Sequence, residues 1–490
     1  MNSMRWHNLY RRWVLQRHFR FAKEHLGDHF FDALTAYALG LGKLGIVEAK
    51  EAAWALSQLR KDPIPGFSGQ LEDVFFTIDF YLRERFGSEV ASALRRGLSR
   101  NDLDLTVFRA YACERLLRVL TSLSDLRREL LGLGQNHRQT LLTAYTHHRP
   151  AQPTTLGHYL TGVENLLSRD YQRLRSAFQT TDKCPLGAST LAGSPYPVDR
   201  KALAQWLGFG GTLEHTYDAI AAGDWALEIA YALAGMATSL SRLVADLLFW
   251  AEQGGFLVAE KISQGSSIMP QKVNPVVLEH VRGFLAELMG GPTTLGHLNY
   301  STPFGDVNDH GPGVLEPLYN LFYAAEGAVA LLRVALQESR FVPEVLAQGL
   351  RDRSVLASEL VDVLVAGKRL SLAEAYPKVQ GMLRELSSKG RTVAELGLDD
   401  LQSHLGFGDP ELLQALEPER FIARRKVLGG AAPEAQAVYL DYALNRLKLE
   451  RLELKELKSR RRKALRTLAQ DPLSLLGEAR SQSPIQSYRA

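Results

Sequence analysis

Residues 224–253 read DWALEIAYALAGMATSLSRLVADLLFWAEQ and predict one long helix. The segment contains no proline and a single glycine, and its large apolar residues, such as Leu240, Leu243 and Leu247, recur at intervals of three and four. A helix of about 30 residues is much longer than the usual ~11–12. Because apolar side chains cover several of its sides, we expect it to be buried in a bundle.

Other segments favour the same architecture. Leucines at helical spacing run from about Leu105 to Leu131, and further long helices are expected to begin near Val277 and Val314. Alternating patterns typical of β-strands are scarce. We therefore predict an all-α fold, with a central long-helix bundle and smaller N- and C-terminal helical domains.

Clusters of proline and glycine divide the chain, at residues 63–66, 254–255 and 429–433. The organisation we expect is an N-terminal helical domain (1–104), a central bundle (105–350), a C-terminal helical domain (351–438) and a charged helix with a tail (439–490). The residues from about Gln470 onward are expected to be frayed.

The composition argues against several classes of partner. A formal net charge of +4 gives no global signal for nucleic acid or membranes. A basic run at residues 458–463 lacks interleaved aromatic residues, so no nucleic acid is expected. Cys113 and Cys184 lie in no CxxC pair, so neither a metal site nor a disulfide framework is expected. No secretory signal and no uninterrupted apolar stretch of membrane-spanning length is found, and we expect a cytoplasmic protein.

Residues 265–275, GSSIMPQKVNP, carry the chemistry. Small residues expose backbone N–H groups, and the loop adds two hydroxyls, a lysine and an asparagine, a combination that suits an anion. A flexible surface loop is the alternative. Met269-Pro270 and Asn274-Pro275 weaken it, because they fix the backbone on both sides of Lys272.

This segment resembles the signature of the fumarase/aspartase superfamily. Further blocks are most similar to argininosuccinate lyases: SRND at 99–102, YTH at 145–147, AQPTTLGH at 151–158 and LGA at 186–188. The resemblance extends from about residue 40 to about 440. It implies a helical-bundle lyase acting on a small-molecule substrate, without a cofactor, and a homotetramer with composite active sites.

By this resemblance Ser266 is the general base. A serine hydroxyl is too weak a base unless backbone N–H groups and a nearby cation stabilise its ionised form. Lys272 is a catalytic partner and, with Asn274, faces the carboxylate that gains charge. Gln271 and Ser267 are expected to bind substrate, although Ser267 could instead cap local backbone.

His147 is the second catalytic candidate. In the resembling family, the matching histidine pairs with a glutamate at the position of Glu279, and such a carboxylate fixes the tautomer of the imidazole. Arg100 could be a structural ion pair rather than a substrate ligand. The residues expected to bind substrate carboxylates here are Ser99, Arg100, Asn101 and Thr146.

Departures from argininosuccinate lyases gather at expected substrate contacts. Leu103 follows SRND, and His148, Arg149 and Pro150 follow the YTH block. Gly223 replaces a charged residue, and residues 300–309 differ from the family's segment for the amino-acid end. The elimination residues are retained. We therefore expect a lyase that splits argininosuccinate or an analogue into fumarate and an amine or guanidine. The alternatives are a specialised biosynthetic lyase for a different aminosuccinate, and a non-catalytic relative with the basic run as a partner site.

Overall fold

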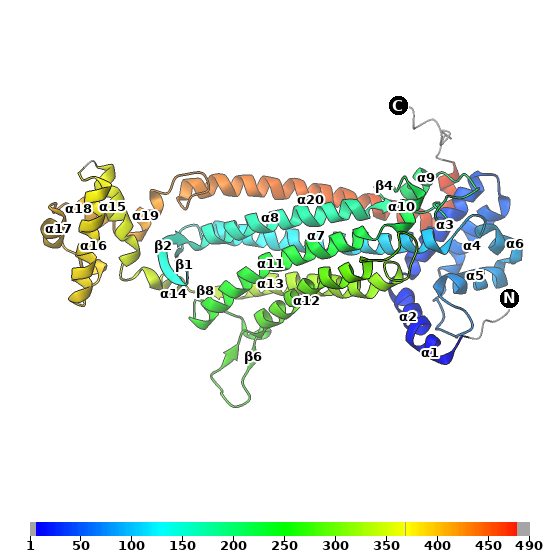
Figure 1. Cartoon of the computed structure of the whole chain (residues 1–490), viewed down its shortest axis with the longest axis horizontal. Helices are drawn as coiled ribbons and strands as arrows, with labels where there is room; N and C mark the ends of the chain where they lie inside the picture. Colours follow the sequence, from blue (N-terminus) through cyan, green and yellow to red (C-terminus); the bar gives the residue numbers. More distant parts are fainter. Residues whose placement is uncertain (1–5, 368, 478–490) are drawn as a thin grey trace, which may run out of the picture.

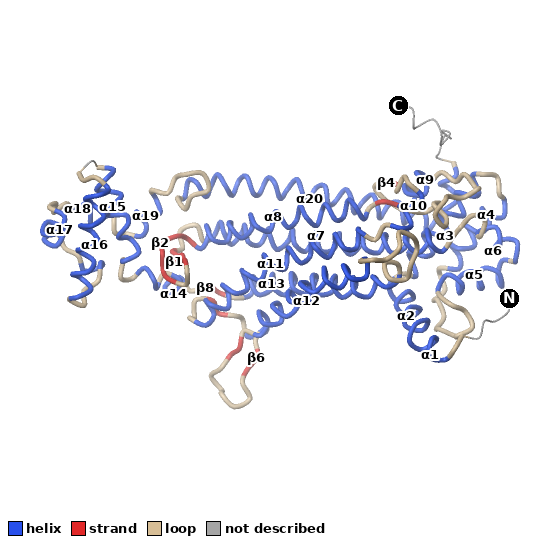
Figure 2. The backbone as a smooth tube through the Cα atoms, in the orientation of Figure 1, coloured by secondary structure: helices blue, strands red, loops and turns tan. Residues whose placement is uncertain are grey.

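The computed structural model describes residues 6–367 and 369–477. Long helices lie side by side in an elongated central bundle, with smaller helical regions at its two ends (Figures 1 and 2). The bundle helices are α7 (Arg100–Asn136), α8 (Leu156–Thr181), α11 (Asp224–Glu252), α12 (Val276–Asn299) and α13 (Leu315–Glu338). The predicted all-α fold and its four long helical runs are confirmed.

α11 matches the quoted segment almost residue for residue. It ends at Glu252, and Gly254 just beyond adopts a φ of +80°, a left-handed conformation that glycine adopts without strain. Trp225, Leu233, Leu240 and Leu247 are fully buried. By length and mean hydropathy α11 could cross a membrane, but 56% of its most apolar window is buried within the protein, as in a bundle core.

The N-terminal helices share one hydrophobic core with the bundle, in which Tyr37 and Leu39 are fully buried. They are α1 (Asn8–Tyr10), a π-helical turn (Arg11–Leu15), α2 (Gln16–His25), α3 (Gly27–Lys43), α4 (Val47–Leu59), α5 (Val74–Phe86) and α6 (Ser88–Leu94). Because α7 starts at Arg100, the boundary expected after residue 104 falls inside a helix.

A second hydrophobic core, which includes Leu360, Met382 and Leu401, holds the helical region at the opposite end of the bundle. Its helices are α15 (Ala357–Ala366), α16 (Leu372–Ser388), α17 (Leu398–Leu405), α18 (Pro410–Gln414) and α19 (Pro418–Ala423), preceded by α14 (Pro343–Leu346).

The strands of the described chain form four two-stranded sheets. Three pair antiparallel: β1 (Leu141–Thr146) with β2 (Arg149–Thr155), β5 (Phe256–Leu257) with β8 (Arg340–Phe341), and β6 (Gln264–Gly265) with β7 (Val273–Asn274). β3 (Lys183–Cys184) and β4 (Gly211–Thr212) pair in parallel, beside α9 (Arg200–Trp206) and α10 (Thr216–Ala221).

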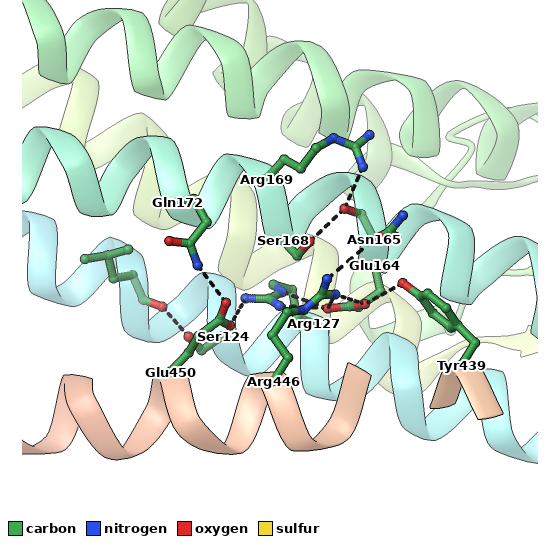
Figure 3. A network of polar contacts seen from close by, with 11 residues as sticks. Ser124, Arg127, Glu164, Asn165, Ser168, Arg169, Gln172, Tyr439, Arg446 and Glu450 are labelled. Atoms are coloured by element: carbon green, nitrogen blue, oxygen red, sulfur yellow. Dashed lines mark hydrogen bonds and ion pairs between the residues drawn. The ribbon is translucent and has the colours of Figure 1, made fainter. Parts of the chain in front are cut away.

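The long helix α20 (Pro433–Gln470) runs back along the bundle beside α7. A buried polar network joins it to α7 and α8 (Figure 3). The guanidinium of Arg127 donates to Glu164 at 2.8 Å and to Glu450 at 2.6 Å, and Arg446 donates to Glu164 at 2.9 Å. Arg127 and Glu164 are both fully buried, so removing either one would leave the other as an uncompensated buried charge.

The expectation of a frayed end from Gln470 is wrong for the part that the structure describes. Residues Pro472–Leu476 form a 3₁₀ turn, with Pro472 and Leu475 buried against α3 and α4. Their apolar surface removed from water stabilises the turn. Residues 478–490 lie outside the described residues.

Candidate active site

The first group of predicted site residues lies where α7 begins. Ser99 is the N-cap of α7: its Oγ accepts from the backbone N–H of Asn101 at 3.2 Å and donates to the amide oxygen of that residue at 2.7 Å. Ser99 and Asn101 are partly exposed, and Thr190 Oγ1 lies 3.5 Å from Ser99 Oγ. This helix N-terminus offers hydroxyl and amide groups to an anion.

Asp102 holds this corner together. Its carboxylate accepts from the backbone N–H groups of Ser99, Gly187 and Ser189, at 3.2, 2.8 and 3.0 Å. Burial raises the pKa of Asp102 to about 6, and the same backbone N–H groups act in the opposite direction. The SRND and LGA blocks therefore meet through one buried carboxyl group.

Arg100 points away from this corner into a cluster of acidic groups. It forms ion pairs with Glu72 and Asp73, each at 2.9 Å, and lies 3.8 Å from Asp104. Asp73 in turn caps α5 by accepting from the backbone N–H of Phe76 at 2.8 Å. Of the two roles considered for Arg100, these contacts favour the structural one.

The second group lies at the far end of α7. Thr146 ends β1, and His147 and His148 form the two-residue turn to β2. Their φ angles are +51° and +59°, the left-handed pair that a tight type I′ hairpin requires. Such angles are costly for residues other than glycine and concentrate at functional sites. All three side chains are exposed, and Arg149 pairs with Thr146 across the hairpin.

The signature segment is a second hairpin, which projects from the same end of the bundle (Figure 1). β6 and β7 form its base, and the backbone N–H of Ser266 donates to the Lys272 carbonyl at 3.2 Å. Ser266 Oγ accepts from the backbone N–H groups of Ile268 and Met269, at 3.3 and 3.0 Å. Two N–H donors on one oxygen stabilise negative charge there, as an ionised serine base requires.

The remaining signature residues are open to solvent within one chain. Ser267, Gln271 and Lys272 are exposed, and Asn274 is half-buried in β7. Glu279 is exposed in the first turn of α12. Among the described residues, no hydrogen bond or ion pair joins Glu279 to His147.

One chain does not bring the two groups together. α7 has 37 residues, or about 55 Å of helix at 1.5 Å per residue, and it separates Ser99 and Asn101 from Thr146 and His147. The signature hairpin lies at the histidine end (Figure 1). A site that uses both groups needs more than one chain.

Residues 300–309 and Gly223, which depart from the family pattern, lie near the N-terminal end of α11. Tyr217 stacks on Phe304 with ring centroids 5.4 Å apart and donates its hydroxyl to the Phe304 carbonyl at 2.9 Å. A Cβ at Gly223 would lie 1.9 Å from Asn299 Oδ1, so no other residue fits there without a shift. Burial raises the pKa of Asp104 to about 7, and the nearby Asp306 adds to this rise.

Sequence reasoning missed Asp102 and Thr190. The S-x-x-D spacing of Ser99 and Asp102 is a capping-box signal that could have identified the helix start, and the structure has this box. The approach of Thr190 to Ser99 joins positions 91 residues apart, and no local pattern reports it.

Known proteins similar to this chain include lyases. The family model described as Lyase matches residues 70–290. Argininosuccinate lyase 2 of Agrobacterium fabrum is 33% identical over 446 residues, covering 87% of this chain and 88% of that protein. Argininosuccinate lyase of Methanosarcina barkeri is 30% identical over 435 residues, covering 86% of this chain and 88% of that protein.

Solved structures agree. A variant of EDDS lyase with bound fumarate is similar with a TM-score of 0.81 at 25% identity, over 93% of each chain. A class II fumarase from Schistosoma mansoni, at 15% identity, is similar in fold alone, with a TM-score of 0.66 over 80% of this chain and 90% of that one.

The bundle and the signature hairpin, together with these relatives, define a lyase of the fumarase/aspartase superfamily. Within it, the chain belongs to the argininosuccinate lyase family. It is a carbon–nitrogen lyase.

Proposed function

We propose that this enzyme splits an N-substituted succinate, argininosuccinate or an analogue, by β-elimination to fumarate and an amine or guanidine. The observation that carries the proposal is the hydroxyl oxygen of Ser266, which accepts two backbone N–H groups beside Lys272. Ser266, ionised, removes the proton from the carbon next to one carboxylate, and the bond from the neighbouring carbon to nitrogen then breaks. Lys272 and Asn274 stabilise the carboxylate that gains charge.

The other residues orient the substrate and its leaving group. Ser99, Asn101 and Thr146 bind the carboxylates, with Gln271 and Ser267 on the signature hairpin. His147, with Glu279 behind it, handles the proton that the departing nitrogen takes up, directly or through water. Binding groups on both sides of the reacting carbons keep the substrate in a reactive geometry.

We also propose that the site is assembled in a homotetramer. The length of α7 supports this, because it separates Ser99 and Asn101 from the β1–β2 and β6–β7 hairpins of the same chain. A site that uses all of them must combine Ser99 and Asn101 of one chain with hairpins of other chains. Exposed apolar residues support it further: Tyr231 on α11, Met289 on α12 and Tyr323 on α13 are each more than half exposed in one chain. Ile268 at the tip of the signature hairpin is 84% exposed. Such surface marks an interface. The enzyme is proposed to act in the cytoplasm.

Of these two substrates, argininosuccinate or an analogue, we favour an analogue whose amine half differs from arginine. Phe304 packs against Tyr217 of α10 in a segment that departs from the family pattern. Gly223 stands where the resemblance places a charged residue, and a side chain there would require Asn299 to shift. Each lost contact to a charged group is worth about 1.5–3 kcal/mol. The loss of a few of them would weaken binding of argininosuccinate by orders of magnitude, without affecting the elimination residues.

The test is fumarate release, followed by its ultraviolet absorbance, from argininosuccinate and a panel of other N-substituted aspartates. We expect kcat/KM on argininosuccinate below about 10⁴ M⁻¹s⁻¹ and a higher value on another panel member. An efficiency on argininosuccinate at or above this value would instead restore arginine as the leaving group. No release from any panel member would contradict the proposed elimination.

A further inference from the structure

α20 and α7 border a long groove that the lyase chemistry does not use. Its volume is about 1000 Å³, and residues 444–465 of α20 and 114–128 of α7 line it. At 1.5 Å per residue, the α20 wall is about 30 Å long. The floor is apolar, built from leucines such as Leu117, Leu447 and Leu454, and the exposed Leu444 and Leu452 extend it to the surface.

Of the twelve residues of α20 that line this groove, seven recur at intervals of four and three, the spacing of the face that one helix presents to another. Five of these residues are cations and the outermost two are leucines: Leu444, Lys448, Arg451, Lys455, Lys458, Arg462 and Leu465. Arg118 and Arg128 line the groove from α7, where they form ion pairs with Glu114 and Asp125.

Much of this charge is unneutralised. Within the described residues, Lys448, Lys455 and Arg462 have no ion-pair partner, and all three are exposed. Glu114 is the acidic residue lining the groove, and it pairs with Arg118. The basic run at 458–463 is therefore divided: Arg460 and Arg461 pair with the buried Asp182 and fix α20, while Lys458 and Arg462 face the groove.

We propose that this groove binds an acidic amphipathic helix of a partner protein. Leucines of such a helix would cover the apolar floor, and its glutamates would meet the row of cations on α20, of which Lys448, Lys455 and Arg462 have no ion-pair partner among the described residues. Helix-in-groove recognition uses this arrangement of apolar anchors, and complementary charge sets partner and orientation.

The same observations disfavour other occupants. In a second copy, the cation row of one α20 would face that of another, and like charges repel. The chain's own last segment, residues 478–490, carries two arginines and one glutamate, so its charge is not complementary. A nucleic acid would neutralise the cations but has no apolar face for the leucine floor.

The test uses a fluorescent peptide of about 20 residues that forms a helix with leucines on one face and glutamates elsewhere, matched to the groove length. Its binding to the full-length protein is measured by fluorescence anisotropy. We expect a micromolar Kd that weakens at least about tenfold in the double variant Lys448→Glu/Lys455→Glu, or ~1.4 kcal/mol. The double variant Lys463→Glu/Arg466→Glu changes exposed cations of α20 outside the groove, and should bind as the wild type does.

A peptide with rearranged leucines and a single-stranded oligonucleotide serve as further probes. A peptide of the same composition, with its leucines spread around the helix, should bind at least about tenfold more weakly. Equal binding of this peptide, no measurable binding of the matched peptide, or equal loss in both double variants would overturn the proposal. Displacement of the matched peptide by a single-stranded oligonucleotide that binds more tightly would assign the groove to nucleic acid instead.

Discussion

The hydroxyl oxygen of Ser266 differs from that of its neighbour Ser267 in one physical respect. Two backbone N–H groups donate to Ser266, whereas Ser267 is exposed and its hydroxyl has no hydrogen-bond partner among the described residues. Those donors are fixed by the hairpin, so they stabilise charge on Ser266 without any rearrangement during the reaction. The two serines therefore make a matched pair of variants.

Replacing Ser266 by alanine should lower kcat by more than tenfold, at least ~1.4 kcal/mol in barrier, because the base is removed. Replacing Ser267 should have a smaller effect. Fumarate release measures both, and circular dichroism checks that each variant is folded. A loss under tenfold in Ser266→Ala, or an equal loss in the two variants, would assign the base to another residue.

For the candidate site, the sequence predicted which residues take part better than it predicted their conformation and contacts. The signature residues and the serine at the start of α7 could be named from motifs. The left-handed turn of His147 and His148 could not, because only a closed hairpin requires it. The contacts of Asp102 with Gly187 and Ser189 span more than 80 residues and depend on how loops meet.

The sequence predicted that α20 is helical, but not that it packs against α7 and α8 through buried ion pairs. Its helical spacing was evident, but a charged helix is usually a solvated one, and nothing local indicates that Glu450 and Arg127 meet in the interior. The buried network holds α20 against α7 and α8 (Figure 3). It thereby also shapes the wall of the groove proposed above as a helix-binding surface.

Replacing Arg127 by methionine should lower the free energy of unfolding by about 3–5 kcal/mol, because Glu164 and Glu450 lose a buried counter-charge. Arg169 is the matched control: it is exposed on α8 and donates to a backbone carbonyl, so Arg169→Met should cost less than about 1 kcal/mol. Chemical denaturation at fixed protein concentration gives both values. Similar values for the two variants would mean that the network contributes little.

At the scale of the whole molecule, the length of α7 sets the distance between the two groups of candidate site residues. The all-α bundle followed from helix periodicity, because buried long helices have a strong sequence signal. The position of the two residue groups at opposite ends of one helix followed only from the structure. The central claim is therefore that one site combines Ser99 and Asn101 of one chain with the hairpins of others.

Mixing two inactive variants tests this claim most directly. Asn101→Ala damages one end of the molecule and Ser266→Ala the other, so both are expected to have little activity. If sites are composite, mixed tetramers formed by joint unfolding and refolding contain some sites without either change, about one quarter for random mixing. Light scattering confirms the tetramers, and fumarate release is then measured on the best substrate. We predict recovery to about one quarter of wild-type activity; mixed tetramers no more active than either variant alone would contradict the composite site.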